Sequence, residues 1–497
     1  MTLSGAPEGF DASLVLRELE TAPRVCHVAR DDKRMAAMAA ALAFFAPHVR
    51  VLSFPGWDCL PYERVSPNVD ISAQRMATLA HLACNASGPF VLLTTLNAAT
   101  QRIPPRELVR TSGFTARAGE HVNETALREF LARMGFVQAP TVAEPGDYAV
   151  RGGIIDIFPP GEGGPVRLDL FGDVLEEARR FDAVTQRTVA QLPAVELAPV
   201  SEIILDEASI SRFRQNYRLE FGAGGSSDPL YEAVSSGRRH SGIEHWLPFF
   251  HERLETIFDY LPDATITLDD RTKAMHEARW EAVNIQYEAR QEARLVVSEM
   301  DSVYKPMPPG LLYLDDAAWH AATKGRKILQ LAVSPQPEGP GSLDAGGRVG
   351  RDFAPERQQE STSLLKAVAG HIRTRARTDQ VVITSYSEGA RERLQGLIAD
   401  HDILGAAPIS DFSDVPEGKG GFFLAVWPLQ HGFESGDGLT FISEQDIFGD
   451  RLTRQPRKRR RADDFLTEAR SLSPEDLIVH VEHGVGRYKG LEVVEAL

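Results

Sequence analysis

Strand and helix patterns alternate between residues 24 and 96, and this alternation limits the possible folds more than any other feature of the chain. Three short apolar strands are predicted at 24–29, 49–54 and 90–95, separated by helices at 33–45 and 71–84. This order is typical of a parallel sheet covered by helices. The first helix carries one apolar stripe that we expect to face the core, formed by Met35, Met38, Leu42 and Phe45.

The chain changes character after Pro104 and Pro105, where short strands and glycine turns continue to about Val200. One amphipathic helix is predicted in this stretch, at 126–134. We therefore expect a separate β-rich domain inserted into the α/β domain. A long polar helix at 272–297 and apolar strands near 311–314 and 328–333 follow, and the strands are candidates to complete the first sheet.

Segment 146–171 of the insertion predicts a β-hairpin whose strands are 154–158 and 166–171. Side chains alternate along a strand, so the second strand has two faces: Val166, Leu168 and Leu170 on one, and Arg167, Asp169 and Phe171 on the other. Arginine beside an aromatic ring is typical of protein–protein hot spots, where loss of one anchor costs about 2 kcal/mol or more. The hairpin is therefore a candidate docking surface. In the alternative, Phe171 closes a small core of its own and the arginines are solvated.

The rest of the chain predicts a second, small α/β domain. Residues 334–350 are rich in proline and glycine without an apolar period, which indicates a linker or long loop. Helices at 361–375 and 388–399 then alternate with strands at 381–385, 421–427 and 439–443. The expected division is an α/β domain in two parts (1–112 and 201–333), the insertion (113–200), a linker (334–360), the small α/β domain (361–445), a basic linker (446–474) and the start of a further domain (475–497). The last segment is too short for a domain, so we expect the chain to be part of a longer protein.

Composition indicates a globular protein of a reducing compartment. Of the 497 residues, 43% are hydrophobic and 25% are charged, and no apolar run approaches the roughly 18 residues of a membrane span. The first residues lack the pattern of a secretory signal. The cysteines Cys26, Cys59 and Cys84 are widely spaced, which argues against a disulfide framework or a zinc site. We expect a cytoplasmic location and no membrane partner.

The charge balance disfavours autonomous DNA binding. The 54 Lys and Arg residues against 70 Asp and Glu residues give a net charge of −16, which repels a phosphate backbone unless basic residues are segregated. One basic run, RQPRKRRR at 454–461, is such a segregation. It is a candidate nucleic-acid or partner patch, most basic at 457–461, or else a solvated linker.

The first strand–helix turn is where a doubly wound nucleotide hydrolase carries its phosphate loop. Such a loop needs the pattern G-x-x-x-x-G-K-[ST], because glycines let backbone N–H groups surround the phosphates. The turn here has no glycine and consists of Arg30, Asp31, Asp32 and Lys33. One of its two aspartates is expected to cap the following helix. We infer a degenerate phosphate loop, no catalytic residues and no nucleotide hydrolysis, so the acidic strand end at 265–270 is not expected to bind Mg²⁺.

Two further motifs leave the chemistry open. The loop FPGWDCLPY, residues 54–62, lies at a strand's carboxyl end, where α/β proteins often bind ligands, although it could equally pack against a neighbouring domain. His480 and His483 lie in a strand-like run and would face opposite sides, so no metal site is expected there.

Several motifs together resemble the bacterial transcription-repair coupling factors (Mfd), in their N-terminal half. They are FPGWDCLPYERVSP at 54–67, LLTTLNAATQRIPP at 92–105, GDYAVRGGIIDIFP at 146–159, VRLDLFGD at 166–173, FDAVTQRT at 181–188 and VHVEHGVGRYKGLE at 479–492. The resemblance covers nearly the whole chain, and is thin at 207–242 and in the small α/β domain.

The resemblance implies a module similar to the repair helicase UvrB before about residue 333, with a degenerate helicase-like sheet that has lost its ATPase. In the family, the β-rich insertion recruits UvrA, and the motifs carry its contact residues to Arg151, Arg167 and Phe171. The segment from 479 resembles the opening of an RNA polymerase interaction domain. ATP and Mg²⁺ would be bound by a DNA-translocating motor outside this chain, which would also make most of the DNA contacts.

Three hypotheses follow from the residues and the resemblance. The leading one is a non-catalytic adaptor that binds UvrA. The others are a UvrB-like ATP-dependent DNA repair helicase, which predicts ATP turnover, and a structural module that contacts only its own parent protein, which predicts no binding of UvrA.

Overall fold

The computed structural model describes residues 1–84, 87–161, 163–222, 228–296, 304–358, 364–401, 403, 405–416, 418, 420–449, 477–480 and 484–487. The chain divides into two compact units, Met1–Ile447 and Phe448–Leu497. In the second unit, β22 (Leu477–His480) pairs antiparallel with β23 (Gly484–Arg487). The basic run at 454–461 and His483 lie outside the described residues.

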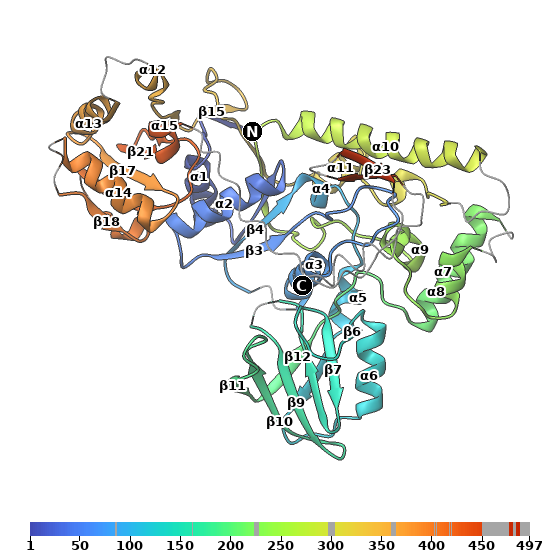
Figure 1. Cartoon of the computed structure of the whole chain (residues 1–497). Helices are drawn as coiled ribbons and strands as arrows, with labels where there is room; N and C mark the ends of the chain where they lie inside the picture. The colour runs from blue at the N-terminus through green and yellow to red at the C-terminus, as the bar shows by residue number, and fades with distance from the viewer. Residues whose placement is uncertain are drawn as a thin grey trace. The chain divides into compact units, whose positions relative to one another are not determined.

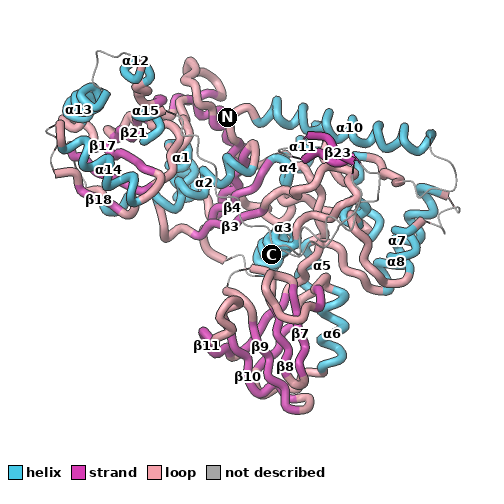
Figure 2. Tube along the Cα trace, in the orientation of Figure 1, coloured by secondary structure: helices cyan, strands magenta, loops and turns pink. Residues whose placement is uncertain are grey.

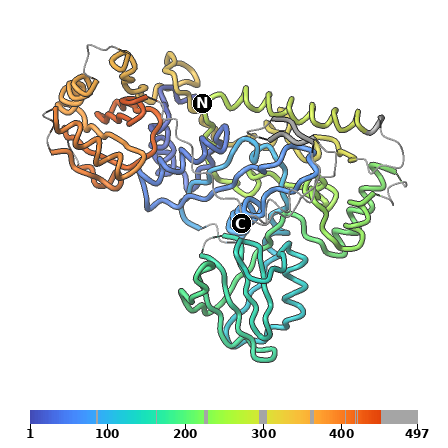
Figure 3. Tube along the Cα trace, in the orientation of Figure 1, coloured from blue at the N-terminus to red at the C-terminus, as the bar shows by residue number. Residues whose placement is uncertain are grey.

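The first unit contains a seven-stranded sheet in which every pairing is parallel, as the strand–helix alternation predicted. Its order is β15 (Ser342–Asp344), β1 (Thr2–Ser4), β14 (Ile328–Leu331), β13 (Thr265–Leu268), β2 (Arg24–Ala29), β4 (Phe90–Thr95) and β3 (Arg50–Phe54). Early and late segments of the chain therefore share one sheet (Figure 3). The prediction that strands after the insertion complete this sheet is confirmed for 328–333.

The predicted strand at 311–314 is wrong. A 3₁₀ helix, η3 (Pro309–Leu311), begins this stretch, and Tyr313 makes only an isolated bridge with Gln101. The apolar residues are nevertheless buried, since Leu312 and Leu314 are at most 2% exposed. Burial without a partner strand produces the same apolar run as a core strand, which explains the error.

Helices cover both faces of the seven-stranded sheet. Helices α1 (Phe10–Thr21) and α2 (Asp32–Phe45) share a core with one set of strand residues, and α3 (Val69–Cys84) shares another core with the alternate set. The long helix α10 (Thr272–Val296) and the short α11 (Asp316–Thr323) lie between β13 and β14 in sequence. Figure 2 separates these helices from the strands by colour.

The predicted stripe on α2 is core, and it joins two domains. Met38 and Leu42 are fully buried. They belong to a hydrophobic cluster that also contains residues of the small α/β domain. The ring of Phe44 stacks on Trp427 at 4.8 Å between centroids. The small domain is therefore docked on the first sheet's helices by an aromatic contact.

The insertion is a six-stranded sheet that is antiparallel except for the pair at its β6 edge, which is parallel. Its order is β11 (Thr188–Leu192), β10 (Val174–Phe181), β9 (Val166–Phe171), β8 (Ile154–Ile157), β7 (Asp147–Arg151) and β6 (Val137–Gln138). Helix α6 (Glu124–Arg133) lies along one side of this sheet (Figure 1) and buries Leu127 and Leu131 against it. The predicted hairpin of β8 and β9 is confirmed. A two-stranded sheet of β5 (Phe114–Arg117) and β12 (Ala194–Leu197) completes the domain.

The small α/β domain has a mixed six-stranded sheet. The order is β16 (Arg348–Val349), β20 (Phe433–Glu434), β21 (Leu439–Ser443), β17 (Gln380–Ser385), β19 (Gly421–Val426) and β18 (Ala407–Ile409), with α13 (Leu364–Arg375) and α14 (Glu388–Ala399). The segment 334–360, expected to be a linker, is more structured than that. It contributes β15 to the first sheet and β16 to this one, because each short strand finds an open sheet edge.

Candidate functional site

The outer face of the insertion sheet brings the three predicted contact residues onto one surface. Arg151 pairs across strands with Ile154, and Ile154 pairs with Asp169, so Arg151 shares the face of β9 that carries Arg167 and Phe171. On the opposite face, Val166, Leu168 and Leu170 are buried. Phe171 is 77% exposed and therefore does not close a core of its own.

Arg167 is held in place by its neighbours rather than solvated. Its guanidinium donates to both carboxylate oxygens of Asp156, at 2.6 and 2.9 Å, and to Gln186 at 3.2 Å. It also lies 4.5 Å from the centroid of the Phe181 ring. The hydrogen bond to Asp156 raises the pKa of Arg167. This fork of contacts fixes a cation at the surface with little rotamer freedom left to lose on binding.

Arg151 is fixed by a loop. Its Nη2 donates to the carbonyl oxygen of Pro140 at 2.6 Å and to Oγ1 of Thr141 at 2.7 Å. The turn that follows needs glycine, because a Cβ on Gly153 would lie 2.5 Å from the carbonyl oxygen of Leu170. The loop and the turn therefore position a second arginine on this face, and this one is exposed.

An ion-pair ladder, which the sequence analysis missed, extends this face across β10. Arg179 donates to Asp169 at 2.9 Å and lies 3.6 Å from Glu177. Asp156 is a charged residue between Ile155 and Ile157 in β8, and it is only 1% exposed. A carboxylate inside an apolar strand was the sequence signal for a buried partner. Its partner depends on the β8–β9 register, which the composition of one strand does not specify.

The turn expected to be a degenerate phosphate loop caps α2 instead of forming a cradle. Asp31 is the N-cap, and its Oδ1 accepts from the backbone N–H of Arg34 at 2.7 Å. Asp32 begins the helix, and both Asp32 and Lys33 are exposed. The expected capping role of an aspartate is therefore confirmed.

Five charged side chains gather at the carboxyl ends of β2 and β13, where a nucleotide's phosphates would be expected. Arg30 donates to Glu8 at 2.5 Å and to Asp269 at 3.3 Å. Arg34, which the sequence analysis did not single out, forms ion pairs with Asp11 and, at 3.5 Å, with Asp269. Burial raises the pKa of Asp11 to about 6, against the opposing effect of Arg34. The arginines thus already have carboxylate partners. Within the described ranges no three His, Cys, Asp or Glu side chains are placed to hold a metal ion.

The FPGWDCLPY loop packs against the chain that returns from the insertion. Trp57 donates its Nε1–H to Glu202 at 3.1 Å, and Glu202 also accepts from Arg75 at 2.6 Å. Cys59 Sγ lies 4.0 Å from Nε2 of His245. Burial, however, raises the pKa of Cys59 to about 12, and it lowers that of His245 to about 4. This pair is therefore not an activated nucleophile and base.

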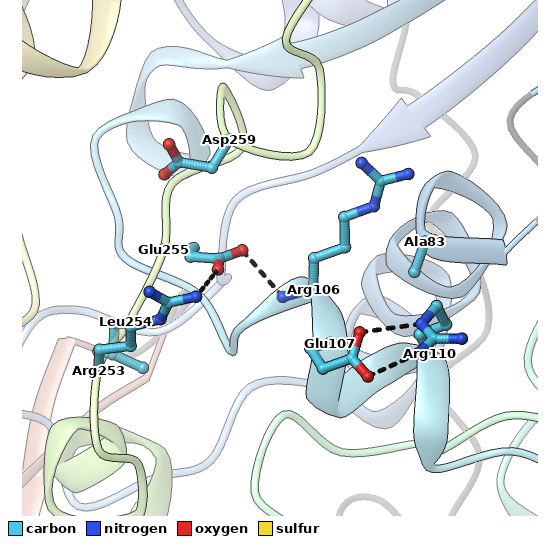
Figure 4. Close-up of a pocket in the computed structure, with 8 residues that line it drawn as sticks. All are labelled: Ala83, Arg106, Glu107, Arg110, Arg253, Leu254, Glu255 and Asp259. Atoms are coloured by element: carbon cyan, nitrogen blue, oxygen red, sulfur yellow. Dashed lines mark hydrogen bonds and ion pairs between the residues drawn. The ribbon is translucent and has the colours of Figure 1, made fainter.

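An open hollow of about 720 Å³ lies beside α5 (Arg106–Thr111), before the insertion begins (Figure 4). Its lining residues are Ala83, Arg106, Glu107, Arg110, Arg253, Leu254, Glu255 and Asp259. Its carboxylates are engaged locally: Glu107 accepts from Arg110 at 2.6 Å, and Glu255 accepts from the backbone N–H of Arg106 at 2.9 Å. The hollow has three arginines and three acids, so it has no net preference for an anion or a cation.

Three domain families match the chain. The UvrB interaction domain matches residues 114–203, the D3 domain of MFD matches 374–447, and the CarD-like/TRCF RID domain matches 472–497. The first match contains the whole outer face of the insertion sheet.

Several relatives are described as transcription-repair-coupling factors. The protein of Escherichia coli K12 is 32% identical over 451 residues, which are 90% of this chain and 38% of that protein. Those of Haemophilus influenzae and Myxococcus xanthus are 28% and 29% identical, over 98% and 99% of this chain and 42% of each relative. The chain thus spans about two fifths of the length of these curated relatives.

Proposed function

Because the chain belongs to the family of transcription-repair-coupling factors, we propose that it acts as a UvrB-like adaptor that recruits UvrA during nucleotide excision repair. The adaptor itself is non-catalytic. UvrA binds the outer face of the insertion sheet through Arg151, Arg167 and Phe171, and the stalled RNA polymerase marks the DNA lesion.

One observation carries this proposal. Within the segment that matches the UvrB interaction domain, an exposed phenylalanine lies on the same sheet face as two arginines that are already fixed by their own contacts. Binding energy in protein interfaces concentrates on such aromatic and arginine anchors. Pre-positioned side chains also lose less conformational entropy when a partner arrives.

Titration of the chain with purified UvrA tests the assignment. Phe171→Ala and Arg151→Ala should each weaken binding roughly 30-fold, which corresponds to about 2 kcal/mol for a hot-spot residue. Val184→Ala is the matched control, because Val184 is 87% exposed in the same domain but lies in the loop between β10 and β11. Equal affinities for all four proteins would refute the proposed interface. Arg167→Ala is less clean, because it leaves the buried Asp156 without its main partner.

We further propose that this chain does not hydrolyse nucleotides. The five-residue charge cluster around Arg30 and Arg34 supports this, because an ATP phosphate would have to displace carboxylates from both arginines. The rival, a UvrB-like ATP-dependent DNA repair helicase, predicts ATP turnover that rises with DNA and UvrA. A purely intramolecular module predicts neither turnover nor binding of UvrA.

DNA, ATP and RNA polymerase are proposed as partners of a longer protein of this family. There, a motor that binds ATP and Mg²⁺ would translocate on DNA and displace RNA polymerase, which would be contacted by the domain that begins near residue 475. A cytoplasmic location fits these partners. No helix among the described residues is both long and apolar enough to cross a membrane.

A further inference from the structure

Helix α10 has an outer face that nothing in the proposed adaptor function uses. The helix is 25 residues long, which corresponds to about 37 Å at 1.5 Å per residue. It is the long helix labelled in Figure 1. A helix of this length offers a partner about three heptads of continuous surface.

The inner face of α10 is anchored firmly. His276 and Val283 are at most 5% exposed. The Arg279 guanidinium lies 5.6 Å from the Tyr313 ring centroid, and the Arg290 guanidinium lies 5.3 Å from that of Tyr304. Arg290 also donates its Nε–H to the carbonyl oxygen of Tyr62 at 3.0 Å. The helix is therefore held in one rotation about its axis, and its outer face is defined.

That outer face carries an exposed apolar seam at heptad spacing, formed by Met275, Ala278, Ala282, Ile285 and Ala289. The steps are three, four, three and four residues, which is the a/d spacing of helices that pack against another helix. Met275 is 40% exposed and Ile285 is 56% exposed. An isolated exposed aliphatic side chain needs no explanation, whereas five in heptad register form a continuous surface.

One edge of the seam is acidic. A row of four exposed glutamates follows this edge: Glu277, Glu281, Glu288 and Glu292. The cationic side chains of Arg279 and Arg290 lie on the other side, turned toward the tyrosines. A second copy of α10 packed antiparallel along the seam would place two glutamate rows against each other, which disfavours self-pairing. A helix with basic residues beside its own apolar stripe would complement both features.

We propose that the seam of α10 is a docking surface for an amphipathic helix of another protein, apolar at heptad spacing and rich in lysine or arginine along one flank. The apolar stripes pack along the seam, and the basic flank pairs with the glutamate row. The surface is separate from the outer face of the insertion sheet and does not depend on that face binding UvrA.

The test uses the whole chain and a designed helical peptide of about three heptads, with leucine at both apolar positions and lysine along one flank. Ala282→Arg and Glu281→Lys/Glu288→Lys should each weaken binding of this peptide at least tenfold. The matched controls are Leu219→Arg, at a side chain 76% exposed on α7 (Glu207–Phe221), and Glu120→Lys/Glu129→Lys, an equal charge change at exposed residues of the insertion. Both control proteins should bind like the unchanged protein.

The outcomes separate the alternatives. A loss confined to the α10 variants supports the docking surface. Equal losses in the controls would mean that the peptide responds only to net charge, and equal binding of a glutamate-flanked peptide would remove the complementarity argument. Absence of binding also overturns the proposal, as does a dimer in sedimentation that Ala282→Arg dissociates, because the seam would then pair with a second copy.

Discussion

The buried ion pair of Arg75 and Glu202 allows a quantitative prediction about the free energy of unfolding. Arg75 is fully buried and its side chain donates to both oxygens of Glu202, at 2.6 and 3.3 Å, and to the carbonyl oxygen of Pro55 at 2.8 Å. Its guanidinium lies 4.1 Å from the ring centroid of Phe54. The pair therefore joins α3 to the chain that returns from the insertion.

Arg75→Met removes the cation and leaves Glu202, which is 3% exposed, with the Trp57 indole N–H as its remaining side-chain donor. Breaking a buried pair from one side costs about 3–5 kcal/mol, because the surviving charge is desolvated without compensation. Arg75→Met/Glu202→Leu removes both charges and should recover most of that loss. Trp57 is partly exposed, so water can then serve its N–H group.

Urea unfolding followed by tryptophan fluorescence measures the change in the free energy of unfolding. The relevant transition is the one in which the part of the fold around Arg75 and Glu202 unfolds. The control is Arg110→Met, which breaks the exposed pair with Glu107 and should change the free energy of unfolding far less, because water screens an exposed pair. The reasoning would be refuted if Arg75→Met behaved like the control, or if the double variant were no more stable than the single one.

Three further changes test other parts of the fold. Gly153→Ala places a Cβ 2.5 Å from the carbonyl oxygen of Leu170 and should lower the thermal midpoint of the insertion without altering the rest of the protein. Phe44→Ala removes the ring that stacks on Trp427 and should lower the free energy of unfolding by about 3–5 kcal/mol. Greater protease sensitivity of the small α/β domain would reveal this loss. His245 is buried with its pKa lowered to about 4, so its contribution of about 3 kcal/mol is present above pH 6.5 and is lost as the pH falls toward 4. His245→Gln should flatten the fall in urea midpoint over that range.

The sequence predicted those parts of the fold in which one segment carries its own signal. The alternation in 166–171 defined the two faces of β9, and the exposed Phe171 agrees with it. The helices 33–45 and 388–399 were predicted within one residue, because caps and apolar periods are local. The partners of buried charges were not predictable in this way. The contact between Arg167 and Asp156 depends on the register across a turn.

Charge contacts between distant parts of the chain were even less predictable from the sequence. Arg30 and Asp269 are 239 residues apart and meet only because β2 and β13 are neighbours in the sheet. The strands of a parallel sheet are all near-continuous apolar runs, so the sequence of one strand does not show which strand is its neighbour. The missing glycines pointed to a lost phosphate loop. The carboxylates of Glu8 and Asp11 that meet its arginines come from a different segment.

Arg34 gives the final prediction, because it faces two buried carboxylates. Asp11, Asp269 and Arg34 each have side chains 3% exposed. In Arg34→Met, Asp11 loses the cation that lowers its pKa, so the pKa of this buried carboxyl group rises further. A carboxyl group whose pKa is raised by folding costs more stability as the pH rises from its unfolded pKa through its folded one, by about 1.4 kcal/mol per pH unit. The loss caused by Arg34→Met should therefore be larger at pH 8 than at pH 5. Arg17→Met, which breaks the exposed pair with Asp437, should give a small loss at both pH values. A pH-independent loss in Arg34→Met would mean that the charge cluster contributes only packing.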